Sequence, residues 1–343
     1  TNNLTIVPNG SEKIGGVAAN FVAQTEGQSI TLVYVDATEG WINTSESTGQ
    51  SGGLPEFITA TGGTITTVCT NFKVHTFTGP GTFTVCSVGN PLGSTSVDYM
   101  VVAGAGAAGN DNSGGGGGGG FRESSGAASG CYTTSPLGSG VSAITVTAQG
   151  YPIVVGAGGA TTPTASTRNS GSDSSALGIP STGGGGGGSD SAQPGLPGGS
   201  GGGGNENGSS AGGTGDTPPV SPPQGNTGAA GSAPTNVGGA GGGAGAAGSG
   251  GTGAVGATTN INGSPTSFAG GGGAGSSPGP GPGAGAGSPC GTGKAGSSTP
   301  GCTSAGPRSA SSNTGGGGGG SGPSSSHGGA GGSGIVIIRY KFQ

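Results

Sequence analysis

Residues 114–122, GGGGGGGFR, decide the fold, and they come shortly after the strand-like stretch VDYMVVAGAGAAG at residues 97–109. The apolar run in that earlier stretch predicts a β-strand. Glycine loses more conformational freedom on folding than any other residue, so a run of seven opposes ordinary strand or helix formation. Because similar glycine runs recur along the chain, one physical explanation must cover most of the protein.

The composition excludes a helical protein. Of the 343 residues, 93 are Gly and 23 are Pro, and only 28% are hydrophobic. Ordinary domains contain roughly 7% Gly and 5% Pro, and both residues interrupt helices. Such a composition is also typical of disorder, but a net charge of −5 gives too little repulsion to keep the chain expanded. We therefore expect a mainly β fold with a glycine-based ordered region and little or no α-helix.

Charge and hydrophobicity narrow the function classes further. The eight Lys and Arg residues are scattered singly, so we expect no nucleic-acid partner. No apolar run reaches the roughly 18 residues of a membrane span, so we expect no membrane insertion. A chain that begins at Thr1, without Met or a signal peptide, indicates a processed protein or a fragment, and we favour the fragment.

Composition divides the chain into five regions. Alternating apolar residues and turn signals predict a small β module with Trp41 as its largest apolar residue, and later a hairpin that turns at residues 78–81. So short a module buries too little surface to be stable alone, and we expect it to pack against copies of itself or against upstream sequence. The regions are the β module at 1–50, a linker at 51–63, a β-sheet anchor with the first glycine run at 64–159, a glycine-rich bundle at 160–333 and a closing β-strand at 334–343.

The closing strand, GIVIIRYKFQ, argues against a disordered tail. Its continuous apolar run predicts burial on both faces of a sheet. We expect its partners to be residues 99–102 and 153–155. The glycine-rich region is then an insertion that is anchored at both ends.

Within that insertion, glycine runs of similar length alternate with polar turns, which predicts many short rods that reverse direction. A rod that accepts Gly and Pro equally is polyproline II, with three residues per turn. Such rods lack internal hydrogen bonds, so they must bond to one another. We expect all-glycine rods in the interior of a bundle, where a Cβ would clash, and rods with Ala, Ser or Thr at its surface.

Motifs for chemistry are weak. The sequence GAGAAG at 104–109 matches a dinucleotide fingerprint, but NDNSGGGGGGG cannot form the helix that must follow it. Around Lys294, GTGKAG departs from a phosphate loop at two required positions. We therefore expect no catalytic residues, no cofactor and no metal site, and a protein that is not an enzyme.

The cysteines are odd in number and lack CxxC spacing, which argues against a metal site. Cys290 and Cys302 bracket one loop and form the candidate disulfide in an oxidising compartment. Cys69 and Cys86 would be out of register across the predicted hairpin. The cysteines are Cys69, Cys86, Cys131, Cys290 and Cys302.

Turns between rigid rods can vary while the scaffold stays fixed, so they are the candidate recognition surface. Each polar turn residue alone is more typical of a solvated loop. Their gathering at the loop tips is the functional hypothesis. The candidate receptor-binding residues are Asp111, Arg122, Arg168, Asp190, Asn205, Glu206, Asn207, Asn262, Phe268, Lys294, Arg308 and His327.

Several segments together resemble the glycine-rich distal tail fibre proteins of tailed bacteriophages, especially those of marine and cyanobacterial hosts. The N-terminal module, TNNLTIVPNGSEKIGG to DATEGWI, resembles a small β module of such fibres. The segments VHTFTGPGTFTV, VDYMVVAGAGAAG, GGGGGGGFRE, YPIVVGAGG and GGSGIVIIRYKF resemble the glycine-rich domain at fibre ends.

The resemblance implies a homotrimeric adhesin at the end of a virion tail fibre, joined to upstream fibre or tail proteins. It implies binding to a host surface polysaccharide or outer-membrane protein, and a bundle of polyglycine-type helices. The family supplies no catalytic residues.

Two other function classes stay open on the sequence. A structural filament or surface appendage would use the rods for strength and would tolerate scrambled turns. An ice-binding protein would need a regular Thr or Ala face, and the irregular runs argue against one.

Overall fold

The chain is mainly β, as the composition predicted. The computed structural model describes residues 4–23, 28–46, 55–90, 93–130, 132–161, 167–276, 309–322 and 327–343. In these ranges, helical structure is limited to the short 3-10 turns η1 (Pro136–Gly138), η2 (Asn207–Ser209) and η3 (Ala233–Thr235). None of the described segments forms a helix with the length and hydrophobicity to cross a bilayer.

The largest sheet is antiparallel, and its central strand is the closing strand of the chain. The order is β10-β9-β17-β7-β6, and β11 pairs with the far end of β9. The strands are β6 (Thr64–Val68), β7 (Phe72–Phe77), β9 (Ser96–Val102), β10 (Phe121–Glu123), β11 (Ile144–Thr145) and β17 (Ile335–Lys341).

Burial of β17 confirms the prediction made from its apolar run. The residues from Ile335 to Tyr340 are all buried, and the strand pairs with β9 and β7. The predicted partner at 99–102 is confirmed, whereas the predicted partner at 153–155 is wrong. That segment belongs to the second sheet and meets β17 through side chains, because both hydrogen-bonding edges of β17 are already occupied.

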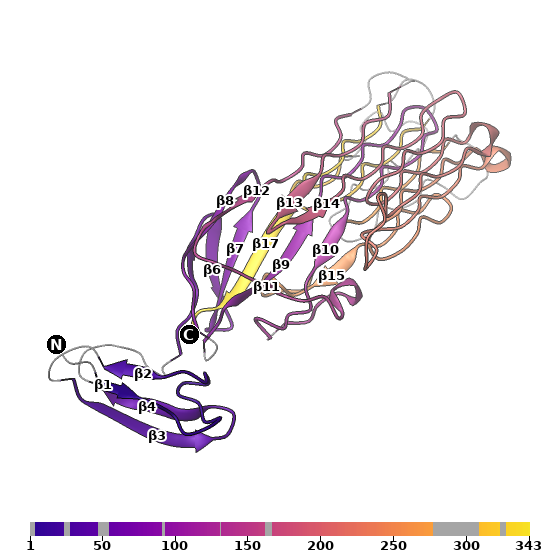
Figure 1. Cartoon of the computed structure of the whole chain (residues 1–343). Helices are drawn as coiled ribbons and strands as arrows, with labels where there is room; N and C mark the ends of the chain where they lie inside the picture. The colour runs from indigo at the N-terminus through magenta and orange to yellow at the C-terminus, as the bar shows by residue number, and fades with distance from the viewer. Residues whose placement is uncertain are drawn as a thin grey trace.

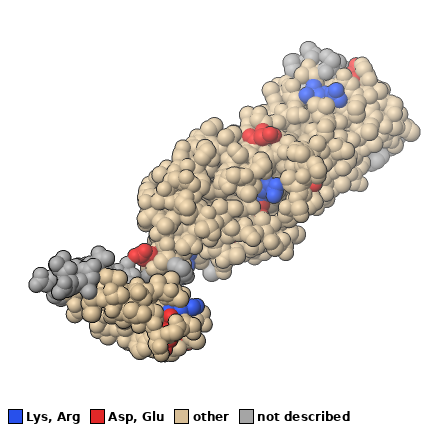
Figure 2. All heavy atoms as spheres, in the orientation of Figure 1, with Lys and Arg blue, Asp and Glu red and all other residues tan. Residues whose placement is uncertain are grey.

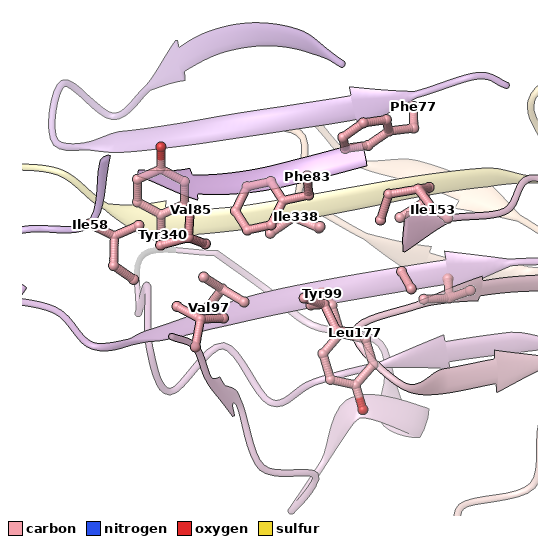
Figure 3. Packing of buried hydrophobic residues seen from close by; sticks show 14 residues of the cluster. Ile58, Phe77, Phe83, Val85, Val97, Tyr99, Ile153, Leu177, Ile338 and Tyr340 are labelled. Atoms are coloured by element: carbon pink, nitrogen blue, oxygen red, sulfur yellow. The ribbon is translucent and has the colours of Figure 1, made fainter. Parts of the chain in front are cut away.

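The second sheet covers one face of the first and encloses the main apolar core (Figure 3). Alternate residues of β17, among them Ile338 and Tyr340, point toward Phe83 and Val85 of β8. The order is β12-β8-β5, with β5 (Thr59–Thr61), β8 (Gly81–Ser87) and β12 (Gly150–Ile153).

The predicted hairpin at residues 78–81 is wrong. β7 and β8 lie in different sheets, so this turn carries the chain from one layer to the other. The edges of β7 are taken by β6 and β17, which leaves β8 to pack its apolar face across the core. Cys69 and Cys86 are both exposed and form no disulfide, and Cys131, Cys290 and Cys302 lie outside the described residues.

Two small hairpins complete the β part. The hairpin β15 (Ala257–Thr259) and β16 (Thr266–Phe268) packs on the other face of the large sheet, against Met100 and Ile337. The hairpin β13 (Ser174–Ala176) and β14 (Ile179–Ser181) adds Ala176 and Leu177 to the main core. Both faces of the large sheet are therefore covered.

Beyond the sheets, glycine-rich segments run side by side without regular strands (Figure 1). Many continue directly from a strand or lead into one. The two packed sheets, called the sandwich below, therefore fix one end of each of these segments. The segments are 103–109, 114–120, 156–161, 167–173, 182–189, 193–198, 199–205, 210–217, 225–231, 237–244, 248–256, 269–276, 315–322 and 327–334.

Hydrogen bonds around residues 114–120 repeat every third residue. Each N–H of this run is donated to a carbonyl of another segment, and three segments accept in turn. Segment 182–189 accepts from Gly114, Gly117 and Gly120; segment 237–244 accepts from Gly115 and Gly118; segment 315–322 accepts from Gly116 and Gly119. Three further segments, 103–109, 199–205 and 269–276, donate to carbonyls of the same run. All six neighbours belong to the same chain.

This packing explains the glycine run. A Cβ placed at any position from Gly114 to Gly119 would lie closer than 3.0 Å to a backbone oxygen of a neighbouring segment. The expectation that Ala and Ser mark only surface segments is wrong, because Ala103, Ala105 and Ser200 are fully buried. Positions within one segment therefore differ in the space that they leave for a side chain.

The N-terminal module consists of two hairpins. These pair β1 (Leu4–Ile6) with β2 (Phe21–Ala23) and β3 (Ile30–Asp36) with β4 (Gly40–Glu46). Trp41 Nε1 donates to Glu12 Oε2 at 3.0 Å, which ties β4 to the loop after β1. Many apolar side chains stay exposed, namely Leu4, Val7, Val17, Val33, Tyr34 and Val35.

We predict that Gly117→Ala destabilises the protein by about 3 kcal/mol, because its methyl group would overlap the backbone at Ser200. The control is Gly79→Ala, since a Cβ at Gly79 meets nothing within 4 Å. Urea unfolding of both variants measures the difference. Equal unfolding midpoints would contradict the packing explanation.

Candidate functional site

The turns farthest from the sheets form the candidate site. Segment 103–109 leaves β9 and segment 114–120 returns to β10, so the turn between them lies at the end away from the sandwich. The same reasoning places the turns at 190–192, 206–209 and 232–236 at this end. We call this end the distal tip.

Side chains and backbone groups from three of these turns are bonded together. Asn205 Nδ2 donates to the carbonyls of Asp111 (2.9 Å) and Asn112 (3.3 Å), and Asn112 Nδ2 donates to Glu206 Oε1 at 2.6 Å. The Asp190 N–H donates to the Asn110 carbonyl at 3.1 Å. The tip cluster is defined as Asn110, Asp111, Asn112, Asp190, Gln193, Asn205, Glu206 and Asn207. These contacts hold the turns in one fixed arrangement.

Local backbone geometry allows the short reversals. Asp111 and Asn112 have φ of 58° and 41°, and Ser191 and Ala192 have φ of 69° and 59°. Asp and Asn tolerate this left-handed region better than most residues. The chain can therefore turn within a few residues and enter the neighbouring position of the bundle.

The tip cluster is acidic. Burial raises the pKa of Glu206, and the nearby carboxylates of Asp111 and Asp190 raise it further. On the face shown in Figure 2, charged side chains are few and separate. Within the described ranges, no three His, Cys, Asp or Glu side chains lie close enough to hold a metal by themselves.

The structure brings together five of the predicted residues: Asp111, Asp190, Asn205, Glu206 and Asn207. Arg168 lies near this end, where its Nη1 donates to the Pro194 carbonyl at 2.9 Å. His327 is exposed at the start of the last glycine-rich segment. Lys294, Arg308 and the candidate disulfide between Cys290 and Cys302 lie outside the described residues.

Three predicted residues are elsewhere. Arg122 is in β10 at the sheet, and Asn262 is in the turn between β15 and β16, where its Nδ2 donates to Thr266 Oγ1 at 3.0 Å. Phe268 is a core side chain, 3% exposed. They lie apart from the tip cluster because a rod has two ends, and the turns or strands at the sheet end do not reach the tip.

Sequence reasoning missed Asn110, Asn112 and Gln193. The signal available was the tetrapeptide NDNS between two glycine-rich segments, which is rich in residues that turn and bond to backbone. Spacing alone did not show that residues 110–112 would lie beside 205–207.

A second polar group is buried against the large sheet and has a structural role. Asp98 accepts from Ser124 and Ser129, and Glu123 accepts from Ser135 and Thr259. The Arg339 guanidinium is fully buried, and it lies 4.7 Å from the ring centroids of both Phe72 and Tyr132. The side chains of Asp98, Glu123 and Arg339 are at most 2% exposed and do not face solvent.

We predict that Glu123 makes stability depend on pH. Burial raises its pKa in the folded state, with a smaller contribution from Asp98. A carboxyl with a raised folded pKa contributes stability below its unfolded pKa and loses that contribution as pH rises through the folded value. The stability of the wild type relative to Glu123→Gln should therefore fall as the pH rises above about 4, the ordinary range of a Glu carboxyl. Urea unfolding across this range measures it, and a constant difference would show the prediction to be wrong.

The comparisons with known proteins give one match. A family model described as "Glycine-rich domain" matches residues 76–341. No curated protein and no solved structure matches significantly. The matched region spans the large sheet from the end of β7 to the end of β17, with every described glycine-rich segment between them. The chain therefore belongs to the glycine-rich domain family.

Proposed function

We propose that this protein is the receptor-binding tip of a bacteriophage tail fibre and acts by binding, without catalysis. Its partner would be a polysaccharide or an outer-membrane protein on the host cell. The observation that carries the proposal is the tip cluster, in which polar residues from three separate turns are held together at one end of the bundle. The resemblance of the β module and the glycine-rich segments to fibre ends gives the biological context.

We also propose that the glycine-rich segments are polyglycine II helices. This helix has three residues per turn, so successive N–H groups point in three directions. The period of three in the bonds donated by residues 114–120 supports this assignment. Absence of side chains in such rods lets neighbours approach closely enough for backbone bonding on all sides.

A rigid bundle suits recognition. Turns that are already ordered lose little conformational entropy when a ligand binds. Their side chains can change without disturbing the glycine contacts behind them, because those contacts involve backbone atoms. A host receptor could thus be exchanged through substitutions in the turns alone.

We predict that Asn207→Ala and Asp190→Ala weaken binding to host cells at least about tenfold, or ~1.4 kcal/mol. Asn207 is exposed at the tip, and its Nδ2 lies 3.4 Å from Asp190 Oδ1. The matched control is Asn262→Ala, in a turn at the sheet end. Fluorescently labelled chain on a panel of bacteria identifies a bound strain and then measures the variants.

The structural-filament alternative makes the opposite prediction. It needs no selective binding, so the tip variants and the control would behave alike on every strain. Such a result would remove the receptor-binding proposal.

The fibre proposal includes a homotrimer located in the virion. Its support is the apolar surface of the N-terminal module, where Leu4, Val7 and Val35 are each more than half exposed. Two-stranded sheets are marginally stable alone, so burial of this surface between copies would stabilise the module.

We predict a solution mass of about three times the chain mass of 30.9 kDa. Light scattering measures it. The double variant Val33→Ser and Val35→Ser should lower the mass toward one chain, whereas Ile65→Ser, at an exposed apolar position on β6, should not. A monomeric wild type would contradict the homotrimer.

A further inference from the structure

Unpaired oxygen atoms collect in the tip cluster. Among the described residues, four buried side-chain oxygens there accept no hydrogen bond: Asn110 Oδ1, Asn112 Oδ1, Gln193 Oε1 and Glu206 Oε2. Asn110, Asn112 and Glu206 are only 7%, 8% and 8% exposed. A buried polar atom without a partner is costly, about 1–3 kcal/mol, and needs an explanation.

The groups that carry these oxygens are neighbours. Asn112 Nδ2 donates to Glu206 Oε1, so the amide and the carboxylate face each other, and the second oxygen of each has no donor. The Glu206 N–H donates to the Asn112 carbonyl at 3.4 Å. The Asp190 N–H donates to the Asn110 carbonyl, and Gln193 accepts from the Asn205 N–H through its own carbonyl. All four unpaired oxygens therefore belong to turns that are in contact.

The unpaired atoms of the tip cluster share one chemical property. Every unpaired atom is an acceptor, and the carboxylates of Asp111 and Asp190 add negative charge beside Glu206. Arg168 directs its Nη1 to the Pro194 carbonyl. A sugar hydroxyl has one O–H and can donate to only one of these oxygens, whereas a cation accepts lone pairs from several oxygens at once and also offsets the negative charge.

We propose that the tip cluster binds a calcium-type divalent cation through Glu206 Oε2, Asn112 Oδ1 and Asn110 Oδ1. Carboxylate and amide oxygens are the ligands of hard cations, and Ca²⁺ accepts irregular sets that water completes. Asp111, Asp190 and Gln193 surround the site. A site with so few direct carboxylates belongs to the weak extracellular class, with Kd on the order of 10⁻⁴–10⁻³ M.

Cation binding would join the turns at 110–112 and 205–207 by ionic contacts in addition to their hydrogen bonds. This inference does not require that the tip bind a receptor. It assigns a ligand to the tip itself.

The test is calorimetric titration of the full chain with CaCl2, with MgCl2 and NaCl as comparison salts. Calcium should bind with a Kd in the range given above, and magnesium more weakly, because magnesium demands a nearly ideal octahedron. Glu206→Gln should weaken calcium binding at least about tenfold. Asn110→Ala should also weaken it, and this second variant keeps the bond between Asn112 and Glu206. The control Glu56→Gln removes the same charge from an exposed side chain in the segment before β5 and should bind calcium as the wild type does.

Circular dichroism before each titration shows that the variants are folded. No heat of binding with CaCl2 up to about 10 mM would overturn the proposal, since that concentration exceeds the weakest expected Kd. Calcium binding that is unchanged in both tip variants would also overturn it, because the ion would then lie elsewhere.

Cell binding measured with calcium and with a chelator separates this inference from the receptor proposal. Calcium bound at the tip of a chain that adheres to no strain would support the cation site and argue against receptor binding. If adhesion depends on Asn207 but the titration with CaCl2 gives no heat of binding, the result would support receptor binding and argue against the cation site.

Discussion

A backbone N–H donated to the carbonyl of a different segment is the interaction on which the glycine-rich part depends. In an α-helix the partner is four residues away, so one segment can form alone. Here residues 114–120 donate to three other segments and accept from three more. A single segment has no stabilising bonds of its own, and the segments must therefore become ordered together. Glycine is required because the bonded backbones lie too close for a Cβ at the central positions.

The sandwich supplies what the segments lack. Its two apolar cores lie on opposite faces of the large sheet, and β9 and β17 contribute to both through alternate residues. β9 continues directly into a glycine-rich segment, and β10 and β17 each follow one directly, so sheet register fixes the relative positions of those segments where they meet the sheet. The burial of apolar side chains in the sandwich thereby offsets part of the conformational entropy that is lost when the glycines become ordered.

Sequence predicted the parts that local rules control. Apolar periodicity identified β9 and β17, and the run at Ile335 to Ile338 predicted burial on both faces. The prediction that β12 pairs with β17 was wrong, because the apolar character of a strand does not show whether it pairs within a sheet or packs against another sheet. The hairpin predicted from the GPG turn was wrong for the same reason, because β7 and β8 lie in different sheets.

The candidate site shows a similar limit. Polar turns such as NDNS and NENG were recognisable, but their proximity depends on which end of a rod each turn occupies. Phe268 and Asn262 lie in an equally polar stretch, and the hairpin that contains them packs on the sheet. Ala105 and Ser200 show that even the space for a methyl or hydroxymethyl group depends on the lateral neighbour, which composition does not specify.

The position of β17 determines when the fold can be completed. This central strand follows all the described glycine-rich segments in the chain, and its partner β7 ends more than 200 residues earlier. During synthesis, β7 and β9 leave the ribosome long before the strand that lies between them, so the large sheet lacks its centre until residue 341 is made. Contacts between such distant residues fold slowly, because a long loop must close before any stabilising bond forms. Until then the edges of β7 and β9 that pair with β17 have no partner, and unpaired edges of this kind can pair with another chain.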